Sequence, residues 1–283
     1  MIRYRSRQSL ISFFLLILFS VFSVITLFPI FALIMSSFRP GTDLMRFGIT
    51  MESLLNRDKN LDNYRELFFG ERSLFNLWFR NSMIILMLQT SVTVFLTSLV
   101  GYGLAVYTFK GRNVLIGLVL ILMMVPIQIL ILPLYKMMIT MKLMNTILGV
   151  MLPFMLSPIA IFFFRQFCLG LPLELMDAAR IDGLSESGIY FRIMSHLMLP
   201  AYGAMAILEG LRSWNNYLWP LIVLRTTKKF TIPIGLNTLL TPYGNNYNVL
   251  ISGAVIATIP IIILFLMFQR YFISGLSSGS VKG

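Results

Sequence analysis

The stretch from Glu174 to Ile193, ELMDAARIDGLSESGIYFRI, interrupts a chain that otherwise consists of long apolar runs. The chain has 57% hydrophobic and 12% charged residues, whereas ordinary soluble domains have about 45–50% and about 25%. Too little polar surface remains to cover a water-soluble globule, so we expect a membrane protein. A charged stretch between two apolar runs is then expected to be exposed at the membrane surface.

The first half of this stretch predicts a short helix. Residues 172–181 are good helix formers, and a proline at position 172 suits a first helical turn, where its missing N–H is not needed. Glu174 and Asp177 come early, where the helix dipole favours negative charge. Asp182 and Gly183 end the helix, because glycine tolerates the backbone angles of a tight turn.

The second half predicts another short helix, which Ser185 can cap and which carries Ile189, Phe191 and Ile193. One face of the first helix is small, at Ala178 and Ala179, so another backbone could approach it closely. From the residues alone, two interpretations remain open: a docking element for a partner protein, or an amphipathic helix lying on lipid.

Six stretches qualify as membrane spans, since a spanning helix needs about 20 mostly apolar residues. They are 10–36, 81–107, 114–136, 146–167, 199–224 and 248–272. The basic start MIRYRSRQ would suit a signal peptide, but the first run is too long for one and no small-residue cleavage site follows, so we expect a retained anchor. The third and fourth spans are interrupted by Pro126, Pro133, Pro153 and Pro158.

Lys and Arg in short loops predict the orientation. An N-terminus in the cytoplasm also places these basic residues there: Arg3, Arg5, Arg7, Lys110, Arg112, Arg165, Arg180, Arg192, Arg270 and Lys282. Six spans return the C-terminus to the same side. The mixed-sign segment 39–80 falls outside, with Lys136, Lys142, Arg225, Lys228 and Lys229. The net charge of +12 fits such loops better than nucleic-acid binding, since no basic, aromatic-interleaved patch occurs.

The sequence lacks the residues that metal clusters and ATP-binding loops require. The chain has one cysteine, Cys168, and one histidine, His196, so a Cys- or His-based metal cluster is not expected. No G-x-x-x-x-G-K-[ST] loop for ATP occurs. We therefore expect no catalysis, no metal and no cofactor on this chain itself.

The motifs together resemble a known family. D-A-A-R-I-D-G at 177–183 is similar to the EAA loop of permease subunits of bacterial binding-protein-dependent ABC importers. F-x-N-S at 79–82, M-M-V-P at 123–126 and W-N-N-Y-L-W-P-L-I-V-L at 214–224 extend the resemblance. The C-terminal Q-R-Y-F-I-S-G-L-S-S-G-S-V-K-G at 269–283 looks like the tail of the MalG-like, carbohydrate branch.

The resemblance implies an all-α membrane protein with the type I importer permease (MetI-like) core. It implies an anchor helix and extracytoplasmic segment over 1–76, a transmembrane domain over 77–272 with a coupling loop at 168–198, and a cytoplasmic tail over 273–283. The implied partners are a homologous second permease subunit, two ATPase copies that carry ATP and Mg, and an extracytoplasmic solute-binding protein. The implied location is the bacterial cell membrane. The implied solute is an oligosaccharide or sugar derivative, although glycerol-phosphate-type solutes travel through close relatives.

The resemblance also assigns the coupling role. The loop would dock into a cleft on the ATPase through these residues: Glu174, Asp177, Ala178, Ala179, Asp182, Gly183 and Ile193. The tail near 277–282 would reach the ATPase too. The sequence departs from the family at Asp177, where Glu is usual, at Leu184, where Ala is typical, and at His196, which replaces a Pro. At His196 we weigh a helix without its usual bend against a proton-sensitive contact with the ATPase.

The fifth span carries unusual charge. Glu209 lies about ten residues, roughly 15 Å, from its cytoplasmic end, near the middle of a hydrocarbon core of about 30 Å. Charges there face a cavity or a partner, and Glu209 and Arg212 can pair at i, i+3. With Asn215 and Asn216 they form either a wall of the solute path or a structural pair against the sister subunit. Trp214, Tyr217 and Trp219 are more typical of an interfacial belt than of a sugar-stacking surface.

Three other kinds of protein stay possible from the residues. An ion-coupled secondary carrier would need carboxylates within the spans, and only Glu209 qualifies. An intramembrane enzyme would need a metal cluster or a nucleophile with its base. A membrane-anchored scaffold would need neither, and would not transport solute.

Overall fold

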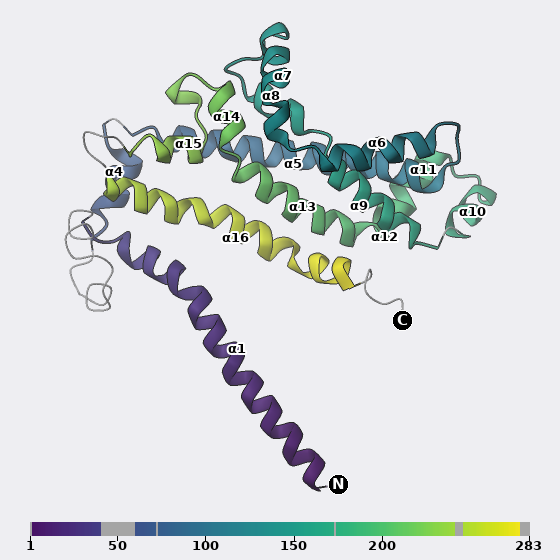
Figure 1. Ribbon diagram of the computed structural model, residues 1–283, viewed down its shortest axis with the longest axis horizontal. Helices are drawn as coiled ribbons and strands as arrows, with labels where there is room; N and C mark the ends of the chain where they lie inside the picture. Colours follow the sequence, from purple (N-terminus) through teal and green to yellow (C-terminus); the bar gives the residue numbers. More distant parts are fainter. Residues whose placement is uncertain (1, 41–59, 72, 173, 241–245, 278–283) are drawn as a thin grey trace. The chain divides into compact units, whose positions relative to one another are not determined.

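The computed structural model describes residues 2–40, 60–71, 73–172, 174–240 and 246–277, and for 2–11 and 272–277 the backbone only. Every regular element in these ranges is helical, and no strand occurs in them (Figure 1). The chain forms two compact units, Met1–Ser73 with Leu236–Ile256 and Leu74–Gly235 with Ala257–Gly283. The all-α expectation from the sequence is confirmed.

The α-helices have the following bounds: α1 (Ile2–Ser36), α4 (Asp62–Phe69), α5 (Phe75–Val106), α6 (Arg112–Met124), α7 (Ile127–Thr140), α8 (Ile147–Met151), α9 (Pro158–Leu169), α10 (Glu174–Ile181), α11 (Glu186–Ile189), α12 (Ser195–Leu197), α13 (Leu199–Trp214), α14 (Leu218–Val223), α15 (Ile232–Asn237) and α16 (Tyr247–Ser277). Short 3-10 turns lie at Leu152–Phe154 and Thr227–Lys229, and Tyr190–Met194 is a π-helical segment.

Three helices are long and apolar enough to cross a membrane without a break: Ser12–Ser36, Phe75–Val106 and Tyr247–Tyr271. Three bent pairs pass the same test together: α6 with α7 at 104°, Ile147–Phe154 with α9 at 45°, and Glu186–Leu197 with α13 at 75°. Six spans result if each bent pair crosses once, and this is the number expected. The first half of the third pair, Glu186–Leu197, falls in the stretch 168–198 that was predicted as the coupling loop rather than as part of a span. The first two breaks lie at Pro126 and just before Pro158, where proline's missing N–H interrupts the helical ladder.

The smaller unit is held by polar contacts between short segments. The hydroxyl groups of Ser37 and Tyr64 are 2.6 Å apart. The amide of Asn63 donates to the carbonyls of Ser37 and Arg39 at 2.8 and 2.7 Å. Asn63 is buried, so these bonds supply the partners that a buried amide requires. They connect the end of α1 to α4 within this unit.

In the larger unit, α9 and α13 pack along α5 (Figure 1). At Gly101 of α5, a Cβ atom would lie 2.6 Å from the Cβ of Phe164 and 2.9 Å from the carbonyl oxygen of Ile161. Glycine is thus what lets α5 approach α9 so closely, as small residues do in membrane helix packing. At the far end of α5, the guanidinium of Arg112 donates to the carbonyls of Leu104 and Ala105 at 2.9 and 3.0 Å, and so satisfies the open end of the helix.

The fifth span differs from the prediction of one segment over 199–224. The helix α13 ends at Trp214, and α14 begins only at Leu218. Asn215 and Asn216 occupy the break. Asparagine competes with the helical backbone for hydrogen bonds, whereas hydropathy alone registers only the apolar residues on both sides.

Candidate functional site

The loop 174–193 forms two short helices around a glycine turn, as predicted. α10 begins at Glu174, two residues after Pro172. Gly183 has φ +79°, a backbone conformation that glycine adopts without steric cost. The Ser185 side chain accepts the N–H of Gly188 at 3.2 Å and caps α11, which confirms the predicted cap.

Arg180 joins the two short helices. Its guanidinium donates to Asp177 at 2.8 Å within α10 and to Glu186 of α11 at 2.7 Å. Asp177 is thus already neutralised inside the loop, although its side chain remains 71% exposed. No role in joining the two helices was predicted for Arg180. The spacing of Asp177 and Arg180 indicates their pair, because residues three apart share a helix face, whereas the pair with Glu186 depends on the turn between α10 and α11.

Glu186 also ties the loop to the long helix α5. The hydroxyl of Tyr107, just past the end of α5, donates to Glu186 at 2.6 Å. The hydrogen bonds from Arg180 and then Tyr107 hold the pKa of Glu186 below its usual range. Burial and the bond to the Glu186 carboxylate raise the pKa of Tyr107. At neutral pH the carboxylate is therefore ionised, the phenol is protonated, and Arg180, Glu186 and Tyr107 form one connected contact.

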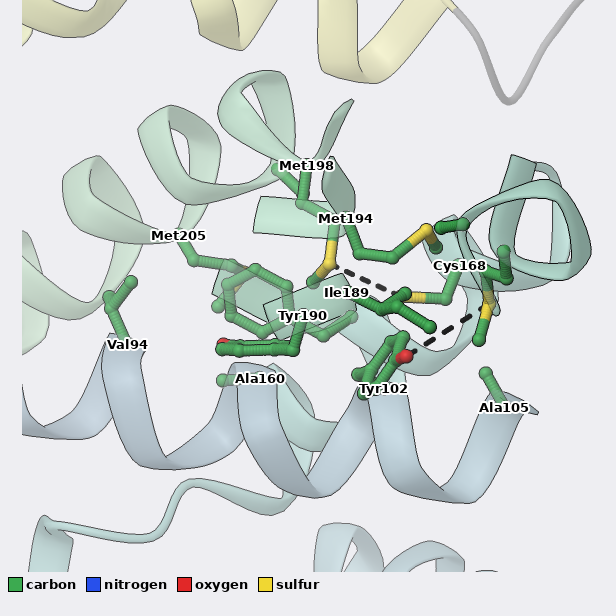
Figure 2. Packing of buried hydrophobic residues seen from close by; sticks show 14 residues of the cluster. Val94, Tyr102, Ala105, Ala160, Cys168, Ile189, Tyr190, Met194, Met198 and Met205 are labelled. Atoms are coloured by element: carbon green, nitrogen blue, oxygen red, sulfur yellow. Dashed lines mark hydrogen bonds between the residues drawn. The ribbon is translucent and has the colours of Figure 1, made fainter. Parts of the chain in front are cut away.

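The inner face of the loop packs into a buried cluster (Figure 2) that spans α5, α9, α10 and α13. Met176 and Ala179 belong to this cluster, at 1% and 4% exposure. The expectation that Ala179 offers a small face to a partner is therefore wrong, because Ala179 points into the chain's own core. Ile193 is half-buried against the same cluster.

The outer face of α10 presents the other predicted residues. Glu174, Asp177, Ala178, Asp182 and Gly183 are all exposed. To these the structure adds Ile181, a large apolar side chain that is 87% exposed at the end of α10.

The helix that carries His196 is bent in spite of the missing proline. Glu186–Leu197 meets α13 at 75°, and the break lies at Met198, with Pro200 in the first turn of α13. The interpretation of a straight helix is wrong, because Pro200 has no N–H for the carbonyl four residues before it and so interrupts the helical hydrogen bonds there. His196 is exposed, and its nearest polar contact is the Ser195 hydroxyl at 3.5 Å. A proton-sensitive contact with the ATPase stays a prediction.

A second site lies in the larger unit, at the bends of the broken helices. A cavity of about 540 Å³ is lined by three of the four predicted path residues, Glu209, Arg212 and Asn216. Asn215 is exposed and does not line it. The rest of the wall comes from the α6–α7 corner, the segment before α9, Gln89 of α5 and Trp219.

The charges in this cavity compensate each other. Glu209 is buried, and its Oε1 accepts from the Ser157 hydroxyl at 2.6 Å and from Arg212 at 3.3 Å. Ser157 is also the N-cap of α9, where its oxygen accepts the N–H of Ala160. The carboxylate therefore lies beside the positive end of a helix as well as a guanidinium. The predicted Glu209–Arg212 pairing is confirmed.

The two tryptophans of this region are internal. The indole of Trp214 donates to the carbonyl of Ala257 at 3.0 Å, and that of Trp219 to the carbonyl of Gly149 at 3.2 Å. Both tryptophans are buried. The expectation of an interfacial belt is wrong for these two, because their N–H groups have partners inside the protein.

Broken helices that line a cavity with a few polar groups in its wall are features of helical transport proteins. The family model described as binding-protein-dependent transport system inner membrane component matches residues 94–278. The chain belongs to this family of ABC importer permease subunits, and is a multi-pass membrane protein with a transport role rather than an enzyme.

Individual relatives agree with this. The chain is 52% identical, over all 283 residues of both chains, to the arabinooligosaccharides transport system permease protein AraQ of Bacillus subtilis (strain 168). It is 54% identical to the protein of the same name from Halalkalibacterium halodurans, over 99% of each chain. A bacterial ABC transporter for import of the acidic polysaccharide alginate has a chain that matches with a TM-score of 0.79, at 20% identity, over 93% of this chain and 96% of that one. The resemblance to the carbohydrate branch and the permease fold are confirmed.

Proposed function

We propose that this chain is a permease subunit of an ATP-driven importer of oligosaccharides, of the arabinooligosaccharide kind. One observation carries the proposal: more than half of the residues are identical, from end to end, to a permease whose name gives that solute. The match runs the full length of both chains, so the aligned region includes the cavity and the loop.

The loop 174–193 is the contact for the cytoplasmic ATPase. Its outer face offers acidic groups and Ile181 to a partner, while its inner face is fixed to the core. Two ATPase copies, which bind ATP and Mg, would grip this loop and that of a homologous second permease. Their differential affinity for the two states of the permease would then shift the membrane helices between inward- and outward-facing forms.

The orientation follows from this contact. The ATPase is cytoplasmic, so the loop, the turn at Lys110–Gly111 and both chain ends lie on the cytoplasmic side. The solute-binding protein delivers oligosaccharide from the opposite side. An ATPase contact was also expected for the tail near 277–282, of which residues 278–282 lie outside the described residues.

The ion-coupled carrier has little support left. Its only candidate carboxylate, Glu209, is bound by Ser157 and Arg212. A coupling carboxylate must gain and lose a cation during transport, whereas this one already has a fixed counter-charge.

Reconstitution tests the proposal. The permease would be purified with its co-expressed partners in mild detergent, identified by mass spectrometry, and placed in proteoliposomes with the solute-binding protein. We expect a second permease, a P-loop ATPase and uptake of arabinooligosaccharide that requires ATP. A preparation that contains the chain alone, or uptake that follows an ion gradient without ATP, would contradict it.

A further inference from the structure

The cavity beside Glu209 contains an unsatisfied polar group from another helix. Gln89 of α5 is 5% exposed and lines the cavity, yet its Oε1 has no hydrogen-bond partner among the described residues. A buried amide oxygen without a hydrogen-bond partner destabilises the protein, because the bond it made to water is not replaced. Such a group is retained where something else supplies the missing donor.

The cavity is well suited to a ligand. At about 540 Å³ it lies within the roughly 300–1,000 Å³ typical of small-molecule pockets. Its wall is mainly apolar, from the α6–α7 corner and the segment before α9, with a few converging polar groups. That composition is typical of sites that hold a ligand by its apolar faces and orient it by hydrogen bonds.

The charges of the cavity indicate what kind of ligand fits. Glu209 and Arg212 are the only charged side chains in the described wall, and they are paired. A carboxylate or phosphate would have to compete with Glu209 for Arg212. A hydroxyl group needs no counter-charge, and can donate to the free oxygen of Gln89 while accepting from Arg212 or the amide of Asn216.

We propose that this chain holds its own solute subsite in this cavity, and that the subsite selects neutral polyhydroxy compounds through Gln89. The inference rests on the proposed importer function and adds to it a solute contact residue on this subunit. A sugar ring placed here would lie against Phe154 and Leu156 and donate one hydroxyl to Gln89. The anionic solutes carried by other importers of the family would be excluded.

The test uses the complete reconstituted transporter with its binding protein. In Gln89→Leu, the amide is replaced by an apolar side chain of similar size, and Gln89→Asn keeps the amide on a shorter arm. The control is Gln128→Leu, because Gln128 is exposed on α7 and does not line the cavity. Uptake of arabinooligosaccharide and ATP hydrolysis stimulated by the loaded binding protein are both measured.

We expect Gln89→Leu to lower uptake about tenfold, the factor that corresponds to about 1.4 kcal/mol, while stimulated ATP hydrolysis is kept. Gln89→Asn should give an intermediate value, and Gln128→Leu should match the wild type. Wild-type uptake of the neutral sugar should be unaffected by excess sn-glycerol 3-phosphate. Equal uptake by Gln89→Leu and wild type, or inhibition by the phosphate, would overturn the subsite and leave the importer standing.

A second measurement keeps the proposal testable if Gln89→Leu assembles poorly, or if the sister subunit fills the cavity in the complex. In Gln89→Cys, alkylation by a small maleimide should slow when ATP and loaded binding protein supply the solute, because the bound solute covers position 89. The native Cys168 adds no background, because it is fully buried. A cysteine at position 89 that never reacts, or that reacts equally with and without solute, would overturn the proposal. No ATP-dependent uptake of any sugar by the wild type would remove the importer function itself.

Discussion

Gly183 holds the turn of the loop 174–193 at φ +79°, and no heavy atom lies within 4 Å of where its Cβ would be. Space is therefore available for a side chain, and the only obstacle to one is the backbone conformation. A residue with a Cβ pays about 1–2 kcal/mol there. A substitution at Gly183 therefore tests backbone strain alone, without a steric clash of the new side chain.

We predict that Gly183→Val loses about 1–2 kcal/mol of stability and that ATP-driven uptake falls with it, because the two short helices lose their relative orientation. Gly183→Asn should stay close to the wild type, since asparagine adopts left-handed backbone angles more readily than valine. Thermal unfolding in detergent and uptake in proteoliposomes measure both. A valine variant as stable and active as the asparagine variant would show that the turn is not under this constraint.

At Asp177 the structure adds an ion pair within the loop to the predicted contact with the ATPase. An acidic group for the ATPase was expected there, and the group is exposed, but it is also paired with Arg180 at 2.8 Å. Exposed pairs of this kind contribute only about 0–1 kcal/mol to stability. If charge reversal at Asp177 lowers transport, the cause is therefore the changed surface offered to the ATPase and not a loss of stability.

We expect Asp177→Lys to stay folded in the membrane and to lose ATP-driven uptake by about tenfold or more, the factor that about 1.4 kcal/mol of lost docking energy gives. Asp62→Lys reverses an exposed charge on α4 and should have no such effect. Uptake and co-purification of the ATPase are the measurements. Full uptake by Asp177→Lys would remove the role assigned to this carboxylate.

At the scale of elements, the packing of α5 against α9 depends on Gly101. Gly101→Val would place atoms against the backbone of α9, at 2.9 Å from the carbonyl of Ile161. Overpacking of this kind costs about 1–3 kcal/mol. Gly103→Val, two residues further along the same helix, meets nothing within 4 Å.

We predict that Gly101→Val unfolds at a clearly lower temperature than Gly103→Val, although both add the same β-branched side chain to one helix. The difference in helix propensity between glycine and valine affects both variants, so it cancels when their unfolding temperatures are compared. Thermal unfolding of the two purified proteins in the same detergent decides it. Similar unfolding temperatures would mean that α5 and α9 are not in close contact.

The sequence predicted elements better than the connections between them. Hydropathy located the six apolar stretches, and local chemistry located the turn at Gly183 and the cap at Ser185. The end of α13 at Trp214 was missed, because Asn215 and Asn216 break a stretch that stays apolar on average. Pairing of Glu209 with Arg212 followed from their spacing, whereas Ser157 lies 52 residues away and only folding brings it to Glu209.

At the scale of the whole molecule, the orientation in the membrane is open to direct measurement. The chain has one native cysteine, Cys168, and it is fully buried. A maleimide that cannot cross membranes should therefore leave the wild type unlabelled. Lys110 and Lys228 are exposed and are expected on opposite sides.

We predict that Lys228→Cys is labelled in intact cells and that Lys110→Cys is labelled only after the membrane is permeabilised. The labelled fraction is read from a gel shift, with the wild type as the background. The reverse result would invert the chain and place the loop 174–193 outside, where no cytoplasmic ATPase could reach it.

The contrast between the first two long helices has a consequence for how the protein is made. The side chains of α1 from Ser12 to Phe31 are all exposed, and all but four Ser and Thr residues among them are apolar, so lipid can solvate them. α5 instead buries polar groups, among them Asn81, Thr93 and Ser98, and these find partners on segments synthesised later. During synthesis, α1 can leave the insertion machinery for the bilayer at once, whereas α5 is stable there only after its later partners have emerged.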